Sequence, residues 1–487
     1  MKKKDILKAI GIVLGIFVVL TWLIPTGSFS GTNVTTETTN PIGLLDIFKY
    51  PIQTALTSIF ITSALVVLLI GGLYGVINKT GVYSNIVEGL AKKFKGKEKN
   101  FLIITILVLG ILSSLTGLVL PLFVLVPFFA AVILTLGYNK LTAMLSTVGA
   151  ILVGNLGSTY AFNINGYIVY FFQNKINDSI WFRLGLFALV IVSLIIFVVK
   201  TAKIEKKKTT KKATKSETKK TTKSEAKEEI VIPLYEKNVD KKQSTTALVV
   251  ICAITLVATL VGMFNWESVL NVKLFTDIYD TITKFELNGY PLFANILGNI
   301  DPMGYWTNTE FCMLIVIAIL LIKWLYNIKL SDAFEGFVNG VKEMVPVAIY
   351  VFIANILFFI INSHVGDSGS TIFPTIANFF LSMTKKFNVL TFGFASIVGS
   401  ILYNDFPYMV NSLLEPINSL TKDYALVGML TQSVHGLVML VAPTSVILVI
   451  GLKYFDVSYK EWFKNIWKYL LIALIAVIII ITIMVLV

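Results

Sequence analysis

The sequence predicts an all-α polytopic membrane protein with about nine transmembrane helices and two oppositely oriented re-entrant hairpins in an inverted repeat. The first observation is composition: the 487 residues are 56% hydrophobic and 14% charged, whereas soluble domains are about 45–50% apolar and about 25% charged. The second is a pair of interrupted apolar stretches, 101–136 and 389–420, in matching positions of the two halves. Interrupted backbone at membrane depth needs surrounding protein or a water-filled cavity, so we expect hairpins at both places.

The other long apolar runs are each long enough to cross about 30 Å of hydrocarbon. We expect crossings at 8–25, 54–78, 141–162, 180–199, 245–264, 309–327, 345–362, 425–452 and 465–487. Two of these crossings contain small and polar residues that we expect to break the helix. The breaks are expected at 154–159 in the first, and at 432–436 and again at 442–445 in the second.

Charge predicts the orientation of the chain in a plasma membrane. The N-terminus, residues 92–99 and the linker 200–243 are rich in Lys, so the positive-inside rule places them in the cytoplasm. The acidic stretch 265–308 then falls outside, as do Lys385 and Lys386, which are an exception to the rule. This distribution explains the net charge of +13 without a nucleic-acid partner.

The chain divides into a first half, 1–199, and a second half, 244–487, joined by the linker 200–243. The linker is a Lys, Thr, Ser and Glu run that cannot bury enough apolar surface to fold, so we expect a disordered tether, with docking on anionic lipid as the alternative. Amphipathic segments at 82–94 and 372–383 precede the two hairpins. They are either interfacial arms that join a fixed part to a moving part or ordinary surface helices.

No hydrolytic or phosphate-binding motif is visible in the sequence. It contains no G-x-x-x-x-G-K-[ST], H-E-x-x-H or G-x-S-x-G motif, so we expect neither an ATP-driven pump nor an enzyme. Cys252 and Cys312 lie in apolar runs, which is typical of small buried hydrophobic residues rather than a disulfide or metal pair. We expect no cofactor, and coupling to Na⁺ or H⁺ stays open.

Paired broken segments are typical of secondary transporters, whose substrate sites lie where the breaks meet. The expected binding residues come from these breaks: Ser113, Ser114, Thr116, Asn155, Gly157, Ser158, Thr159, Asn404, Asp405, Gln432, Ser433, His435, Thr444 and Ser445. Half-helix N-termini favour a carboxylate, whereas bare carbonyls and half-helix C-termini favour a cation.

Each candidate has a simpler interpretation. The hydroxyls at 113–116, which we expect at the tip of the first hairpin, can bond their own helix. Asp405 is either a costly carboxylate near the bilayer centre that needs a partner, or a solvated residue on a shallow tip. His435 is either a proton-coupling group or a neutral side chain bonded to Gln432 or Ser433.

The sequence also resembles the YfcC-like carriers, relatives of the anaerobic C4-dicarboxylate (DcuC-like) carriers of the ion transporter superfamily. The resemblance rests on short motifs at 21–29, 70–72, 78–81, 136–142, 157–159, 442–445 and 457–462. It implies a two-repeat carrier, a homodimer, and an elevator-like movement of the part that holds the hairpins. Related carriers handle dicarboxylates, short-chain acids or amino acids, including arginine/ornithine exchange.

The sequence departs from the YfcC-like pattern where substrate is expected. Leu120 and Pro121 stand in place of an acidic pair, and 403–405 replaces a Ser-Gly-Ser-Gly tip. Val434-His435-Gly436 replaces Gly-Asp-Gly, and Met439 replaces an Asn. We therefore expect this protein to share the architecture that the resemblance implies, but we do not transfer the substrate or the coupling ion to it.

Our hypothesis from sequence is a transporter of a small charged metabolite, most specifically the uptake or exchange of a basic amino acid with its ammonium group at Asp405. A carrier of C4-dicarboxylates or short-chain carboxylates is the alternative, although it requires more cationic or amide donors. A hypothesis of another class is a non-transporting membrane scaffold or receptor. An intramembrane enzyme would need a nucleophile–base pair that the sequence does not offer.

Overall fold

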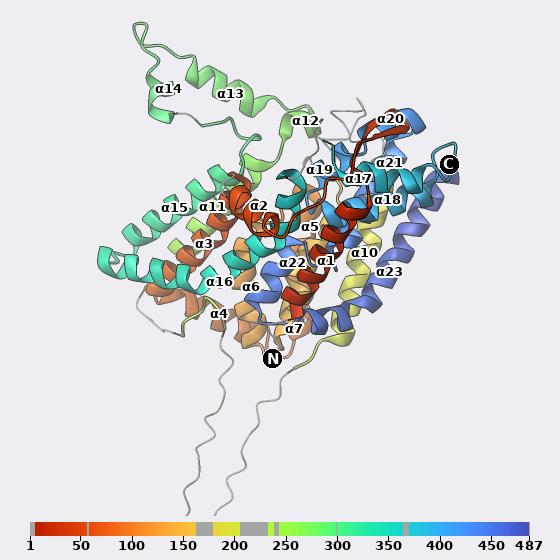
Figure 1. Cartoon of the computed structure of the whole chain (residues 1–487). Coiled ribbons are helices and arrows are strands. Elements are labelled where there is room, and N and C mark those ends of the chain that lie inside the picture. Colours follow the sequence, from red (N-terminus) through yellow and green to blue (C-terminus); the bar gives the residue numbers. More distant parts are fainter. Residues whose placement is uncertain are drawn as a thin grey trace, which may run out of the picture.

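The computed structural model describes residues 5–55, 58–161, 179–204, 232–237, 243–298, 300–363 and 370–486. Figure 1 shows a bundle of helices with the N-terminus at one end and the C-terminus near the other. Within the described residues, eight helices are long and apolar enough to cross a membrane, which confirms the all-α polytopic class. They are α1 (Asp5–Leu23), α3 (Ser58–Lys79), α5 (Glu98–Thr116), α10 (Ile180–Thr201), α11 (Thr246–Met263), α15 (Asn308–Leu325), α16 (Leu330–Ser363) and α23 (Tyr459–Leu486).

Six of these eight helices coincide with predicted single crossings. Helix α5 was expected as part of the first hairpin, and α16 begins earlier than the predicted start at 345. The preceding residues, 328–344, carry charges and fall between two predicted crossings. In the structure most of them form the first turns of α16. Ala333 and Met344 are buried there, and Glu335 and Lys342 are exposed. Charges restricted to one face do not interrupt a helix, so the predicted start of this crossing at 345 was too late.

Helices α3 and α16 pack most closely through two pairs of glycines. Gly71 and Gly75 of α3 face Gly336 and Gly340 of α16, and each pair is spaced i, i+4. A Cβ added to Gly340 would lie 1.9 Å from the Gly71 carbonyl oxygen, and one added to Gly75 would lie 2.0 Å from the Gly336 oxygen. The two backbones are therefore in direct contact, as in small-xxx-small pairs of membrane helices.

The first interrupted stretch folds back on itself. After α5, Gly117 adopts φ 68°, and the chain continues as η2 (Pro121–Leu125) and α6 (Val126–Thr135). The Phe101 ring near the start of α5 lies 6.0 Å from the Phe129 ring in α6, so the chain returns towards its starting side. The tip expected at 113–117 was partly wrong, because α5 continues to Thr116 and is itself long enough, at about 28 Å, to span a membrane.

The second interrupted stretch breaks where the sequence predicted, at 403–405. It forms α18 (Val389–Leu402), α19 (Phe406–Asn411) and α20 (Leu414–Leu420). The Gly31 N–H donates to Glu415 Oε2 at 3.0 Å, so α20 lies against the small sheet of β1 (Gly27–Ser30) and β2 (Asn33–Thr36). Figure 1 shows α20 at the end of the bundle opposite α7 (Lys140–Ser146), which follows α6, so the two folded-back segments have opposite orientations.

Both predicted broken crossings are split into two helices. The first forms α7 and α8 (Val148–Leu156), and residues 157–161 after α8 are not helical. The second forms α21 (Tyr424–Met439) and α22 (Val446–Tyr454), with the predicted break at 442–445. The break expected at 432–436 was wrong: a Cβ on Gly436 would lie 2.5 Å from the Leu156 Cα, so this glycine allows close packing of α21 on α8.

Short helices complete the fold. The predicted amphipathic segments are helical, as α4 (Val82–Lys93) and α17 (Ile372–Leu381). Helix α2 (Asp46–Ala55) precedes α3, and the predicted outer stretch contains α12 (Trp266–Leu270), α13 (Leu274–Thr283) and α14 (Leu292–Leu297).

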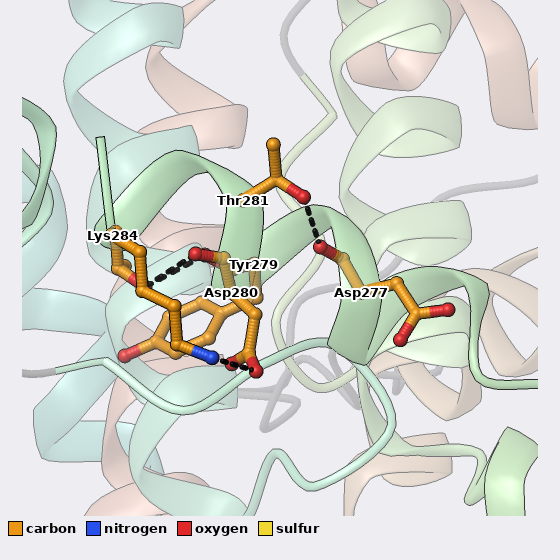
Figure 2. A network of polar contacts seen from close by, with 6 residues as sticks. Asp277, Tyr279, Asp280, Thr281 and Lys284 are labelled. Atoms are coloured by element: carbon orange, nitrogen blue, oxygen red, sulfur yellow. Dashed lines mark hydrogen bonds and ion pairs between the residues drawn. The ribbon is translucent and has the colours of Figure 1, made fainter.

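Figure 2 shows the polar side of α13, where Lys284 pairs with Asp280 at 2.6 Å and Thr281 bonds the Asp277 carbonyl at 2.7 Å. Most of the predicted disordered linker lies outside the described residues.

Candidate substrate-binding site

A cavity of about 640 Å³ lies where the breaks of the two folded-back segments meet. Residues 116–121 of the first break and 404–408 of the second both line it. Asn155 of α8, His435 of α21 and Ser445 at the start of α22 complete its polar wall from the broken crossings. Sites for small metabolites typically have volumes of about 300–1,000 Å³, so this cavity can hold one such molecule.

The structure brings six of the predicted residues to this cavity: Thr116, Asn155, Asn404, Asp405, His435 and Ser445. The other predicted residues are not among those that line it: Ser113, Ser114, Gly157, Ser158, Thr159, Gln432, Ser433 and Thr444. Sequence reasoning missed several polar lining residues, namely Asn265, Asn355, Tyr305, Thr307 and Tyr408. Asn355 could have been found, because an Asn within an apolar crossing needs a polar partner.

The hydroxyls near the end of α5 hold the broken end of α8. Ser113 Oγ donates to the Ile151 carbonyl at 2.8 Å, and Ser114 Oγ donates to the Gly157 carbonyl at 2.7 Å. The Thr159 N–H returns a bond to the Ser114 carbonyl at 2.9 Å. A helix that ends within a membrane leaves its last carbonyls without intrahelical partners. Ser114 supplies a donor just beyond that end, whereas Ser113 adds a second donor to a carbonyl inside the helix.

Gln432 joins the two broken crossings. Its Nε2 donates to the Ser158 carbonyl at 2.8 Å and to the Leu156 carbonyl at 3.4 Å. Within the described part of the chain, its Oε1, together with Asn155 Oδ1 and Ser158 Oγ, is buried without a hydrogen-bond partner. The end of α8 is therefore surrounded by oxygen atoms that are free to accept a donor or to coordinate a hard cation.

Asn404 ties the second break to two neighbouring elements. Its Nδ2 donates to Asn355 Oδ1 at 2.9 Å and to the Thr444 carbonyl at 3.0 Å. Thr444 Oγ1 in turn donates to the Ile401 carbonyl at 3.3 Å. One amide therefore positions the break in α18–α19, the break in α21–α22 and helix α16 relative to one another.

Asn404→Ala is expected to destabilise the protein by about 1–3 kcal/mol, because it leaves the Asn355 and Thr444 oxygens buried without this donor. The free energy of unfolding of purified protein in detergent measures the effect. Asn355→Ala and the double variant complete a mutant cycle, in which a coupling energy below about 0.3 kcal/mol would contradict a direct contact.

Asp405 provides the charge of the site. It is the N-cap residue of α19, where its Oδ1 accepts a hydrogen bond from the Tyr408 N–H at 3.4 Å. Among the described residues that line the cavity, Asp405 is the only carboxylate, and none is Lys or Arg. A carboxylate in this position attracts a cationic group and opposes an uncompensated anion.

His435 also lines the cavity, with different partners from those expected. Its Nδ1 lies 3.2 Å from Ser400 Oγ, and its ring packs edge-on against Phe406 at 5.4 Å. The predicted bonds to Gln432 or Ser433 were wrong, because Ser433 Oγ bonds the Met429 carbonyl one helical turn earlier. A side chain on a continuous helix bonds to its own preceding turn or faces another element, and here His435 faces α18.

The protein has helices long enough to cross a membrane, and several of them are interrupted. A metabolite-sized cavity lies between the breaks. These features define a polytopic membrane protein with a site for a small solute. The C4-dicarboxylate anaerobic carrier (DcuC) family model matches residues 4–486, so the chain belongs to this family. The chain is also similar to a solved structure of the YdaH transporter of Alcanivorax borkumensis, at 12% sequence identity over 97% of each chain and a TM-score of 0.40. A comparison with curated proteins finds no match.

Proposed function

We propose that this protein is a secondary transporter of an amino acid, most specifically a basic one taken up or exchanged through the cavity. The observation that carries the proposal is the charge of the wall: Asp405 is the only formally charged residue among the described residues that line it. An ammonium group pairs with this carboxylate. The amino acid's own carboxylate is then left for the hydroxyls and amides of Thr116, Asn155 and Ser445, and for the N-terminal end of α22.

Transport of a C4-dicarboxylate is the second candidate, and membership of a C4-dicarboxylate carrier family supports it. Two carboxylates next to Asp405 would repel it unless a cation enters with them. The unpartnered oxygens of Asn155, Ser158 and Gln432 offer ligands of the kind that Na⁺ accepts. Coupling to Na⁺ or to H⁺ is therefore part of the proposal for either substrate, and no resident cofactor is needed.

The movement that we propose is elevator-like, with the folded-back segments as re-entrant hairpins in a part that moves. The opposite orientations of these segments and the two broken crossings support this mechanism. We also propose a homodimer in the plasma membrane with the N-terminus and the linker in the cytoplasm, on the basis of the Lys distribution and the family resemblance. No chemical transformation of the solute is proposed.

Counterflow with purified protein in liposomes tests the function. Liposomes loaded with unlabelled lysine, arginine, ornithine, succinate or fumarate are diluted into the labelled solute, with and without Na⁺ and with and without a pH gradient. We expect accumulation of a labelled basic amino acid that depends on the matching internal solute. Accumulation of a dicarboxylate alone would favour the second candidate.

Protein-free liposomes and liposomes with heat-inactivated protein are the controls for leakage. Tight liposomes that contain folded protein and move no solute of either class would contradict both transport proposals. That result would instead support a non-transporting scaffold or receptor.

A further inference from the structure

A short stretch of the linker is held against the helical bundle. Residues 232–237 read Ile-Pro-Leu-Tyr-Glu-Lys, and Tyr235 is the only aromatic residue between positions 200 and 243. Leu234 is 2% exposed, which is unusual for a segment whose composition predicted a solvated tether. Leu234 is therefore packed like a core residue, whereas Ile232, Pro233 and Tyr235 are half-buried and Glu236 and Lys237 are exposed.

The backbone of this stretch is bound from two helices. The Leu234 N–H donates to Glu343 Oε2 of α16 at 2.9 Å. The Leu234 carbonyl accepts from Asn78 Nδ2 at 3.2 Å, and the Glu236 N–H donates to Asn78 Oδ1 at 3.2 Å. The side-chain amide of Asn78, near the end of α3, therefore donates to one backbone group of this stretch and accepts from another. An amide bonded in both ways fixes the position of an extended segment along its length.

Side-chain contacts extend the binding to α4 and α22. The Tyr235 ring packs edge-on against Tyr83 at 5.6 Å, and Lys237 Nζ lies 3.2 Å from Glu88 Oε1. On the other side, the Tyr454 hydroxyl of α22 donates to the Pro233 carbonyl at 3.0 Å. These partners come from both halves of the chain, so the stretch lies across a junction between them.

The conformation of Leu234 also indicates specific binding. Its φ is 55°, in the left-handed region that residues other than glycine rarely adopt. Such a conformation persists where the surrounding contacts determine it. Here those contacts are the bonds to Asn78 and Glu343 on either side of the residue.

We propose that the surface formed by Asn78, Tyr83, Glu343 and Tyr454 is a docking groove for residues 232–237, and that the docked stretch clamps α4 and α16 to α22. Helix α22 begins at the cavity, where Ser445 and Val446 line the wall. A movement of α22 relative to α16 must therefore break the bond from Tyr454 or the bond to Glu343. The docking is independent of the proposed function, whereas the effect of the clamp on transport rests on it.

Limited chymotrypsin digestion of the full-length protein tests the docking. Chymotrypsin cuts after aromatic and large apolar residues, so Tyr235 and Leu234 are the sites expected within 200–243, and cleavage there separates the two halves of the chain. Cleavage at an opened site follows the population of the released form. We expect slow cleavage in the wild type and cleavage about tenfold faster, or more, in Leu234→Ala and in Glu343→Ala.

Glu335→Ala is the matched control. Glu335 lies on the same helix, and its carboxylate pairs with Lys79 at 3.3 Å, on α3, rather than with residues 232–237. We expect this variant to be cleaved at the wild-type rate. Equal cleavage rates in Leu234→Ala, Glu343→Ala and the wild type would overturn the docking.

Counterflow of the same variants tests the clamp. We expect solute exchange several-fold faster in Leu234→Ala and Glu343→Ala than in Glu335→Ala, since a restraint on α22 has been removed. Faster cleavage with unchanged exchange would support the docking and overturn the clamp. A wild-type protein that moves no solute would overturn the proposed function and the clamp together, while cleavage would still decide the docking.

Discussion

Asp405→Asn is expected to reduce counterflow of a basic amino acid by about 100-fold, which corresponds to about 3 kcal/mol of lost interaction with the ammonium group. The substitution keeps the size of the side chain and an oxygen that can accept the hydrogen bond from the Tyr408 N–H. It removes the only formal charge among the described residues of the cavity wall. The helix α19 should therefore keep its N-cap while the substrate loses its ionic partner.

Asp277→Asn is the matched control, because it makes the same chemical change on the exposed helix α13. Figure 2 shows the Asp277 carboxylate directed away from the dashed contacts, and only its backbone carbonyl bonds Thr281. We expect transport by this variant to equal that of the wild type. Counterflow that survives in Asp405→Asn would remove Asp405 from the site, and dicarboxylate flux that is indifferent to the substitution would favour the second candidate.

Gly340→Ala is expected to destabilise the protein by at least about 3 kcal/mol or to prevent its recovery in folded form. The added Cβ would lie 1.9 Å from the Gly71 carbonyl oxygen, and that oxygen belongs to a helix backbone that cannot turn aside. Helices α3 and α16 would have to separate, which would disturb the α16 segment that carries Asn355 to the cavity. The change is measured by thermal unfolding of purified protein in detergent, with the fraction of monodisperse protein as the readout.

Gly89→Ala separates this steric effect from the general effect of replacing a helical glycine. Gly89 lies in the interior of α4, and a Cβ there would have no atom within 4 Å. We expect Gly89→Ala to be neutral or to stabilise the protein by about 0.5–1 kcal/mol, because alanine has the higher helix propensity. Wild-type stability of Gly340→Ala would show that α3 and α16 are not in backbone contact.

The breaks that depend on local chemistry were predictable, and those that depend on a neighbour were not. The break at 442–445 contains Pro443, which has no N–H and disfavours a helical residue before it. The turn at 403–405 ends at the N-cap Asp405, and Pro407 lies in the first turn of α19, where its missing N–H costs nothing. Gly436 looked equally disruptive, yet it lies inside α21 because Leu156 of another helix occupies the space beside it. Sequence cannot distinguish a glycine that ends a helix from one that admits a close neighbour.

The same limit applies to the candidate site. Thr116, Asn155, Asn404, Asp405 and His435 reach the cavity as expected. The serines before Thr116 were assigned to the substrate, but their hydroxyls satisfy carbonyls of α8. A free hydroxyl and a hydroxyl already used by the fold are the same residue type, so only the position of its acceptor distinguishes them.

The sequence by itself determined that this protein is a helical membrane protein with interruptions in matching places, because apolar length, charge and proline act along the local chain. Only the tertiary structure decided which polar residues face the cavity, that the glycines of α3 meet those of α16, and that Leu234 of the linker is buried. Each of these depends on which helix faces come together. In a chain whose helices are apolar on nearly every side, the hydrophobic pattern of one helix does not specify its neighbour.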